Sequence, residues 1–524
     1  MRNVVRSLLL SAALVAGSLN TAFADPHLNF AWPVNVGPLN PHQYAPNQMA
    51  GQTMVYEPLV RYMNDGTVKP WLAESWTVSD DGKTYIFTLR DDVKFSNGEK
   101  FDAAAAKANF DAILANRERH AWLELANQIT AVEDIAPNQL KITLKDAYYP
   151  ILQELALPRP FRFIAPSQFK DGGTKDGIIK PIGTGPWILT ESRLSEKDEF
   201  VRNESYWGKK PVYESVTFKV IPDPNTRAVA FEAGEVDLLY GTDGIIYPDT
   251  YQRFKNMPGY TTKLSAPLES LVLAINTKTG PTRDLAVRRA INHAVDKDKM
   301  IEKVLYGTQL KADTLFSENV PYADAGLTPY AYNVEEAKSL LENAGWKAKT
   351  ENGIREKDGE PLVVELNFVG TDAVAKSISE VVQADLRRAG IDVKLVGEEE
   401  SSIYSRQKDG RFGMIFNGTW GAPFDPHAFV SSMRIPSHAD YQAQQGLADK
   451  AEIDAKITQV LTTTDEKQRR ALYHDILTRL HEEAVYLPLT YITAIAVAKP
   501  EIGDVPFSAM SNEIPFDQLT PAAK

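Results

Sequence analysis

The chain has 524 residues, with 57 basic and 69 acidic side chains and a formal net charge of −12 at pH 7. A chain this acidic, without a run of Lys or Arg, lacks the positive surface that binds phosphate backbones, which excludes nucleic acid as a ligand. The sequence contains no cysteine, which excludes disulfides, thiolate metal sites and cysteine nucleophiles. Any metal must therefore be held by His, by carboxylates or by ligands that it carries.

The first residues predict a cleavable export signal. Arg2 and Arg6 give a positive start, residues 8–19 form a short apolar stretch, and the sequence AFA before Asp25 has the small-x-small pattern that a signal peptidase accepts. The apolar stretch is too short to anchor the protein, and no later stretch approaches the roughly 20 apolar residues of a membrane-spanning helix. We expect residues 1–24 to be a signal peptide and the mature protein to be a soluble exported protein.

Two early segments of the mature chain have clear local patterns. Residues 75–89 predict a β-hairpin, because two strand-like runs flank an Asp-Asp-Gly turn and residues such as Tyr85 and Phe87 alternate onto one face. Residues 101–116 are rich in alanine and predict a helix, with Asp102 as its N-cap.

A strand, a helix and a second strand are predicted further along, at residues 362–368, 373–389 and 391–395. The first segment alternates apolar and polar residues, the second has apolar residues at helical spacing, and Gly390 ends the helix. A strand, helix and strand of these lengths form the βαβ unit, which favours a parallel sheet covered by helices. The predicted fold class is α/β.

The length of the chain predicts more than one lobe. A single hydrophobic core seldom serves this many residues, and the sequence has no low-complexity tract or long flexible linker. The lobes must therefore be joined by short crossings. Candidate crossings lie near residues 265–273 and 487–495, which would build the first lobe from both ends of the chain.

Six strings spread along almost the whole mature chain carry a family resemblance. They are residues 71–76 (WLAESW), 89–98 (LRDDVKFSNG), 183–187 (GTGPW), 202–208 (RNESYWG), 286–296 (AVRRAINHAVD) and 337–346 (AKSLLENAGW). In this order they resemble the extracytoplasmic solute-binding proteins that serve peptide and nickel ABC importers. The resemblance implies a two-lobed periplasmic solute-binding fold, with an extra subdomain inserted in the first lobe, that closes around a solute at the interface.

The resemblance also implies an organisation and partners. We expect the first lobe at residues 25–268 with the inserted subdomain at about 66–185, the second lobe at 269–491, and a return to the first lobe at 492–524. The expected protein is a monomer without enzymatic activity, and it delivers its solute to an inner-membrane permease and the ATPase of that permease.

Longer strings are similar to the nickel-binding members of this family. They are residues 31–42 (AWPVNVGPLNPH), 116–127 (NRERHAWLELAN), 157–163 (LPRPFRF), and 419–423 (TWGAP) running on to 436–440 (PSHAD). This narrower resemblance implies that the cargo is nickel, as Ni(II) already wrapped by a small organic chelator of the histidine or polycarboxylate type, and that no cofactor is permanently bound.

The resemblance assigns His438 as the protein ligand of the metal. A neutral imidazole suits Ni(II), and a chelator can fill the remaining positions of an octahedron. Arg159 stands between Pro158 and Pro160 and matches the arginine that grips a chelator carboxylate, for which a guanidinium offers a bidentate pair. Arg119 is its expected helper.

Other side chains match positions that line the same cavity: Trp122, Trp420, Tyr404, Met49 and Trp32. Large flat side chains bury a ligand with little loss of rotamer freedom. An aromatic residue in a chain with 10% aromatics is more often part of the core, so these assignments depend on the resemblance.

Two residues depart from the nickel-binding pattern. Phe424 stands where those relatives tend to carry Tyr, and Asn512 where a Thr is expected. Hydroxyl groups that would hydrogen-bond a chelator are therefore missing or altered, so the chelator can differ while the metal stays the same.

Two short strings resemble parts of a catalytic site. Ser167 and Lys170 form a Ser-x-x-Lys string and residues 278–280 a Lys-Thr-Gly string, but the Ser-x-Asn element between them is absent, which leaves the proton relay of the penicillin-recognising enzymes incomplete. We therefore expect that the protein is not an enzyme.

A receptor for di- or oligopeptides is the main alternative, because it would share the fold. Peptide-binding relatives hold the ligand ammonium with an acidic residue shortly before an Asp-Pro pair, whereas residues 422–424 here are Ala, Pro and Phe. Burying the ligand ammonium without a charged partner would cost a prohibitive free energy. Asp425 itself is expected to be a turn or cap residue, and Glu399 or Glu400 could take the acidic role instead.

Overall fold

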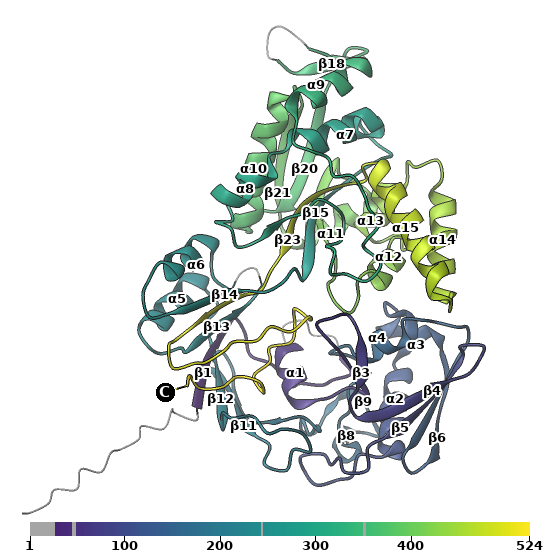
Figure 1. The fold of residues 1–524 in the computed structure, drawn as a ribbon, viewed down its shortest axis with the longest axis vertical. Coiled ribbons are helices and arrows are strands. Elements are labelled where there is room, and N and C mark those ends of the chain that lie inside the picture. Colours follow the sequence, from purple (N-terminus) through teal and green to yellow (C-terminus); the bar gives the residue numbers. More distant parts are fainter. Residues whose placement is uncertain (1–26, 44–48, 243–244, 349–352, 524) are drawn as a thin grey trace, which may run out of the picture.

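The computed structural model describes residues 27–43, 49–242, 245–348 and 353–523. The expected signal peptide at residues 1–24 and the expected start at Asp25 lie outside these ranges. Within them, no helix is both long enough and apolar enough to cross a membrane. Two lobes are stacked along the long axis, and the C-terminus lies in the same lower lobe as β1 (Figure 1).

The first lobe, which is the lower one in Figure 1, contains a seven-stranded sheet. Its strands, in spatial order, are β10 (Trp187–Arg193), β11 (Lys197–Arg202), β12 (Ser215–Val220), β1 (His27–Trp32), β13 (Leu238–Gly241), β24 (Ile495–Ala498) and β14 (Thr261–Leu264). β1 is parallel to β12 and β13, whereas β24 is antiparallel to β13 and β14. The last strand of the chain therefore lies inside the sheet to which the first strand belongs.

The core of this sheet is aromatic. Phe30 is fully buried, and its ring centroid lies 5.0 Å from that of Phe218 and 5.1 Å from that of Phe516. These residues come from β1, β12 and the C-terminal segment, so burial of apolar surface joins the two ends of the chain. The helices α1 (Met49–Val55), α5 (Pro224–Glu232) and α6 (Pro248–Lys255) lie beside this sheet. Two small two-stranded sheets, β2 (Val60–Tyr62) with β3 (Val68–Pro70) and β8 (Phe169–Lys170) with β9 (Gly173–Ile178), lie closer to the rest of the first lobe.

A four-stranded antiparallel sheet forms a separate part of the first lobe. Its order is β4 (Ala73–Val78), β5 (Thr84–Leu89), β7 (Gln139–Leu144) and β6 (Ile129–Ala136), and α2 (Ala103–Leu114), α3 (Glu124–Gln128) and α4 (Ile151–Leu155) lie beside it. The predicted hairpin is confirmed as β4 and β5, with Tyr85 and Phe87 buried on one face. The predicted N-cap is also confirmed, because the Asp102 carboxylate accepts the backbone N–H of Ala105 at 2.9 Å.

The second lobe contains a six-stranded sheet. Its order is β16 (Leu310–Lys311), β23 (Tyr486–Ile492), β15 (Glu269–Ile275), β22 (Met414–Gly418), β20 (Val363–Val369) and β21 (Asp392–Glu398). The predicted βαβ unit is confirmed: β20 and β21 are parallel, with Val363 paired to Asp392, and α10 (Ala373–Arg388) connects them. Ile378 and Leu386 are fully buried on the inner face of α10, and Gly390 follows it with φ of 87°.

Helices surround the second sheet on both sides (Figure 1). They are α7 (Leu285–Ala294), α8 (Lys297–Lys303), α9 (Val334–Asn343), α11 (Glu400–Asp409), α12 (His427–Ser432), α13 (Ala439–Gln444), α14 (Lys450–Thr462) and α15 (Glu466–Glu482). A small three-stranded sheet of β17 (Lys347–Ala348), β18 (Arg355–Lys357) and β19 (Glu360–Pro361) lies at the far end.

Two short segments connect the lobes. Residues 265–268 lead from β14 to β15 and residues 493–494 lead from β23 to β24, so each passes from one large sheet to the other. They run side by side, because Ser265 N–H donates to the Ala494 carbonyl at 2.9 Å. The prediction of a two-lobed α/β fold is confirmed.

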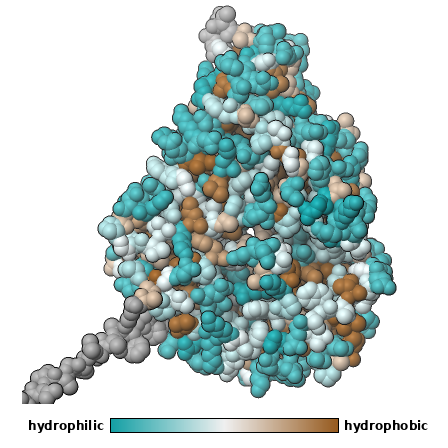
Figure 2. All heavy atoms as spheres, in the orientation of Figure 1, coloured by the Kyte–Doolittle hydropathy of each residue, from teal (hydrophilic) through white to brown (hydrophobic). Residues whose placement is uncertain are grey.

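The lobes are in direct contact beyond these crossings. One cluster of buried apolar residues includes Tyr148 and Leu155 of the first lobe and Phe429 and Tyr473 of the second. Hydrophilic side chains cover most of the face in Figure 2, and apolar groups are scattered between them. The shared cluster shows that the two lobes pack directly against each other, and we call this arrangement the closed form.

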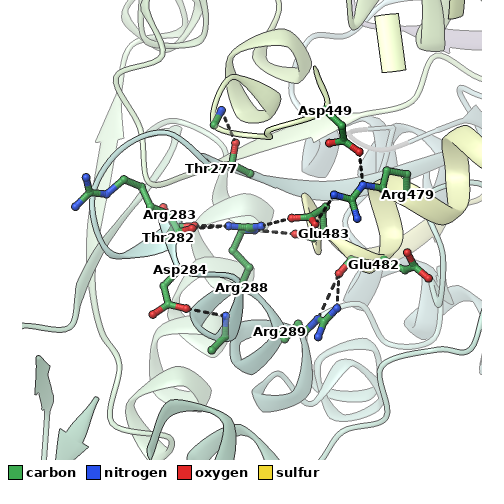
Figure 3. Close-up of polar contacts among 12 residues, drawn as sticks. Thr277, Thr282, Arg283, Asp284, Arg288, Arg289, Asp449, Arg479, Glu482 and Glu483 are labelled. Atoms are coloured by element: carbon green, nitrogen blue, oxygen red, sulfur yellow. Dashed lines mark hydrogen bonds and ion pairs between the residues drawn. The ribbon is translucent and has the colours of Figure 1, made fainter. Parts of the chain in front are cut away.

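A buried arginine organises the second lobe (Figure 3). Arg288 on α7 donates to the backbone carbonyls of Thr282 at 2.9 Å and Arg283 at 3.0 Å. It also donates to the backbone carbonyl of Glu483 at 2.7 Å and forms an ion pair with the carboxylate of that residue at 2.9 Å. Arg479 reaches the other oxygen of this carboxylate at 2.9 Å. The side chain of Arg288 is 3% exposed, so these contacts form away from water and join α7 to the end of α15.

We predict that Arg288→Ala lowers the free energy of unfolding by about 3 kcal/mol or more, because it leaves buried carbonyls and a carboxylate without their donor. The measurement is denaturant unfolding followed by circular dichroism. Arg289→Ala is the matched control, because Arg289 donates to the Glu482 carbonyl from the protein surface, and it should change the value by no more than about 0.5 kcal/mol. Equal losses in both variants would contradict the prediction.

Candidate functional site

The loop of residues 419–426 follows β22 in the second lobe and is held by a buried carboxylate. Asp425 accepts the backbone N–H groups of Trp420 at 3.1 Å and Gly421 at 2.9 Å, and burial raises its pKa to about 7. Gly421 has φ of +71°, and a Cβ there would lie 2.8 Å from the Glu269 side chain, so glycine is required. Asp425 therefore acts as the turn residue that the sequence predicts.

His438 lies just before α13, half-buried, with its ring next to Trp420. The two ring centroids are 5.8 Å apart, and the ring planes are inclined by 43°. Burial lowers the pKa of His438, and the nearby Asp440 carboxylate opposes that effect. Asp440 is itself occupied, because it accepts hydrogen bonds from Tyr486 at 2.7 Å and Asn417 at 2.8 Å. The imidazole is therefore neutral near pH 7, which is the form that coordinates metals.

The first lobe contributes a buried guanidinium. Arg159 follows α4 and is 7% exposed, and its Cζ atom lies 5.5 Å from the ring centroid of Trp122. Arg119 is an exposed residue of the 3₁₀ turn Arg117–His120. It lies near the same place, because burial and then the positive charges of Arg119 and Arg159 lower the pKa of His120 to about 4. The two arginines thus adjoin one neutral histidine.

Three aromatic side chains join these two sides, and we call them the aromatic bridge: Trp122, Phe424 and Trp420. The ring centroids of Trp122 and Phe424 are 6.2 Å apart across the lobe interface, and those of Phe424 and Trp420 are 6.1 Å apart. Arg159 lies at one end of the bridge and His438 at the other. Five of the expected site residues therefore form one continuous set of contacts that crosses between the lobes.

Three further expected residues lie in or beside a cavity of the first lobe. This cavity of about 290 Å³ is lined by Trp32 at the end of β1, by Asn512 and by Ala50. Met49 is buried, precedes Ala50 and begins α1. Trp32 also stacks on Phe30, with ring centroids 5.8 Å apart, so one face of its indole belongs to the core.

Tyr404 is more exposed than the other expected residues of the second lobe. It is 60% exposed on α11, where its hydroxyl donates to the Glu400 carboxylate at 3.1 Å, one turn earlier in the helix. The closed structure thus leaves most of this side chain in contact with water.

Three buried polar residues near the bridge carry no recognisable signal in the sequence. His120, Glu154 and His427 are 3%, 1% and 2% exposed. Each lies within a few residues of an aromatic or basic site residue, but no local pattern marks them, because their partners are distant in the chain. A buried polar group in this position is informative, since such groups are normally kept only where they have a partner or a role.

The arrangement offers chemistry for binding. A neutral imidazole, a buried guanidinium and aromatic faces can hold an anionic guest that carries a metal or a planar group. Within the described ranges, no group of three or more His, Asp or Glu side chains is placed to hold a metal ion together.

Comparisons with known proteins agree with the fold. The family model of bacterial extracellular solute-binding proteins, family 5 middle, matches residues 67–441. The chain is 62% identical over 521 residues, 99% of each chain, to the nickel-binding periplasmic protein of Escherichia coli K12. It is 25% identical over 476 residues, 86% of each chain, to the dipeptide-binding protein of the same organism.

Among solved structures, NikA from Brucella suis in complex with Fe(III)-EDTA is similar in both sequence and shape. It is 70% identical, the match covers 95% of this chain and 100% of that one, and the TM-score is 0.93. With the family model matched across most of the chain and such identity over its full length, the chain belongs to the bacterial extracellular solute-binding proteins of family 5.

Proposed function

We propose that this protein is the periplasmic receptor of an ABC importer and that it captures a nickel–chelator complex between its lobes. One observation carries the proposal: His438 of the second lobe and Arg159 of the first lie at the two ends of a single aromatic bridge. It is supported by 62% identity over 99% of the chain to a nickel-binding periplasmic protein. In this role the receptor acts as a monomer and hands its cargo to an inner-membrane permease and the associated ATPase.

The two ends of the bridge suit the two parts of such a cargo. His438 offers one neutral nitrogen to Ni(II), and a chelator supplies the other donors of an octahedron. Arg159 is nearly excluded from water, so its charge favours an anion, and a planar guanidinium pairs well with a carboxylate. Arg119, which is more exposed, adds positive charge where the chelator enters. The bridge covers the chelator with apolar surface.

The chelator is proposed to be of the histidine or polycarboxylate type. NikA from Brucella suis, 70% identical to this chain, is described in complex with Fe(III)-EDTA, a metal held by a polycarboxylate. Phe424 has no hydroxyl, and Asn512 faces the cavity near Trp32 with an amide, so both residues change which chelators are accepted. Removing one hydrogen bond to a charged ligand changes affinity by about 1.5–3 kcal/mol.

A peptide receptor remains the alternative of the same fold, and Asp425 argues against it. Both oxygens of this carboxylate accept backbone N–H groups of its own loop, so it is occupied rather than facing a guest. Glu400 already accepts the Tyr404 hydroxyl. Saturation of the protein by dipeptides, with no binding of metal chelates, would favour the alternative.

We predict that His438→Ala weakens binding of the nickel–histidine complex at least tenfold, by about 1.4 kcal/mol or more, because one metal–nitrogen bond is lost. Isothermal titration calorimetry measures this effect. The melting temperature of the empty protein should stay within about 2 °C, since the ring is partly exposed. His474→Ala, which removes an exposed histidine from α15, is the control and should bind as the wild type. Unchanged affinity in His438→Ala would show that His438 is not a ligand of the metal.

We predict that Arg159→Gln weakens the binding of polycarboxylate chelates of nickel to the protein by roughly tenfold to a hundredfold, because a hydrogen bond to a charged group is lost. Binding of a nickel complex with an uncharged polyamine, which has no carboxylate, should not be weakened. Competition calorimetry with the two chelates measures the difference. Arg253→Gln is the control, because Arg253 pairs with Glu232 at the surface of the first lobe. Equal weakening of both chelates would contradict a carboxylate-binding role.

We predict that the exported protein begins at Asp25, because residues 22–24 form the expected cleavage pattern. Mass spectrometry of a periplasmic extract gives the N-terminal residue. Ala24→Arg should block cleavage and leave a heavier precursor, whereas Asn20→Gln, upstream of the pattern, should be processed normally. A full-length protein in the cytoplasmic fraction of wild-type cells would contradict export.

A further inference from the structure

The closed interface contains a set of polar contacts that the proposed site does not use. They lie where α4 of the first lobe faces α12 and α15 of the second (Figure 1). Tyr149, just before α4, shares a hydrogen bond of 2.6 Å with the hydroxyl of Tyr473 on α15. The Arg469 guanidinium lies 4.5 Å from the ring centroid of Tyr149. These contacts join side chains of opposite lobes, so they break when the lobes separate.

A buried carboxylate at this place supports the first-lobe half of the aromatic bridge. Glu154 on α4 is 1% exposed and accepts a hydrogen bond from the Tyr148 hydroxyl. Its other oxygen accepts the backbone N–H of Leu125 at 2.9 Å, at the start of α3. Trp122 lies three residues before Leu125, so Glu154 fixes the segment that holds this ring.

The partner of Glu154 supports the second-lobe half. His427 begins α12, is 2% exposed, and its Nε2 atom lies 3.4 Å from Glu154 Oε1. Its ring also contacts Tyr149 edge to face, with centroids 6.3 Å apart. Phe424 lies three residues before His427 in the same loop. The pair therefore connects the two segments whose rings, Trp122 and Phe424, meet across the interface.

Burial makes the contact between Glu154 and His427 sensitive to whether the lobes are closed. Within the closed structure both groups are almost completely removed from water, and they face each other across the lobes at 3.4 Å, a contact that is an ion pair when the imidazole is protonated. When the lobes open, both groups become accessible to water and the contact is lost. If one of the two side chains is replaced, closure buries the other without its partner across the interface. This raises the free energy of the closed form relative to the open form.

We propose that Glu154 and His427 form an interlobe latch that positions Trp122 and Phe424 over the captured cargo and slows its release. Both are positioning residues, since the cargo contacts the rings that they hold. The identity of the cargo rests on the proposed function, whereas the contact itself does not.

The absence of cysteine in the sequence allows a direct test. Lys209→Cys in the first lobe and Lys376→Cys on α10 are at exposed positions and can carry a pair of spin labels. The distance distribution between the labels reports lobe closure, and stopped-flow measurements report release of the nickel–histidine complex. Glu154→Gln, His427→Gln and the double variant are compared with the wild type in the full mature chain.

Each single variant is expected to release the complex about tenfold faster with an unchanged association rate, and to show a larger open fraction when loaded. The double variant should be no faster than the single variants, because each one already breaks the same contact. Glu335→Gln is the control, since Glu335 pairs with Lys338 on the exposed side of α9, far from the lobe interface. It should release the complex at the wild-type rate.

Three results would overturn the latch. Release rates and label distances in the single variants that equal those of the wild type would show that the latch does not exist. Additive effects in the double variant would mean that the two residues act separately, with Glu154 serving only Leu125 and Tyr148. If the wild type does not bind the nickel complex in calorimetry, the proposed cargo fails independently. The latch is then judged on the empty protein, where unchanged distances in Glu154→Gln and His427→Gln would overturn it.

Discussion

The contact between Trp122 and Phe424 is the interaction on which the arrangement of the site depends. It is the point where the aromatic bridge passes from one lobe to the other, with ring centroids 6.2 Å apart. Without it, Arg159 and His438 would belong to separate surfaces of separate lobes. Ring contacts of this kind bury much apolar area without a network of hydrogen bonds, so they can form and separate as the lobes move.

The rest of the structure brings these two rings together. The first-lobe ring is carried by the segment between α2 and α3, which Glu154 supports, and the second-lobe ring by the loop after β22, which Asp425 supports. Both supports are buried carboxylates that accept backbone N–H groups. A carboxylate used in this way fixes a loop without a regular helix or strand, and that is how short irregular segments can hold a site.

The site has two unlike parts. The aromatic bridge has charged or coordinating groups at its ends, whereas the cavity near Trp32 and Asn512 lies in the first lobe alone. The two departures from the nickel-binding pattern fall one in each part: Phe424 is in the bridge and Asn512 lines the cavity. A change of chelator can therefore arise in both parts while His438, the proposed metal ligand, stays the same.

The sequence by itself determined the local elements, because their patterns depend on neighbours in the chain. The hairpin of β4 and β5, the Asp102 cap and the βαβ unit around α10 follow from alternation, capping and helical spacing. The site residues could be named only through a resemblance. Tertiary structure alone decided that Trp122 meets Phe424 and that Glu154 meets His427, since these partners lie in different lobes and no local pattern records a contact between them. It also decided which expected residues stay exposed, as Tyr404 does, because burial depends on how the lobes close.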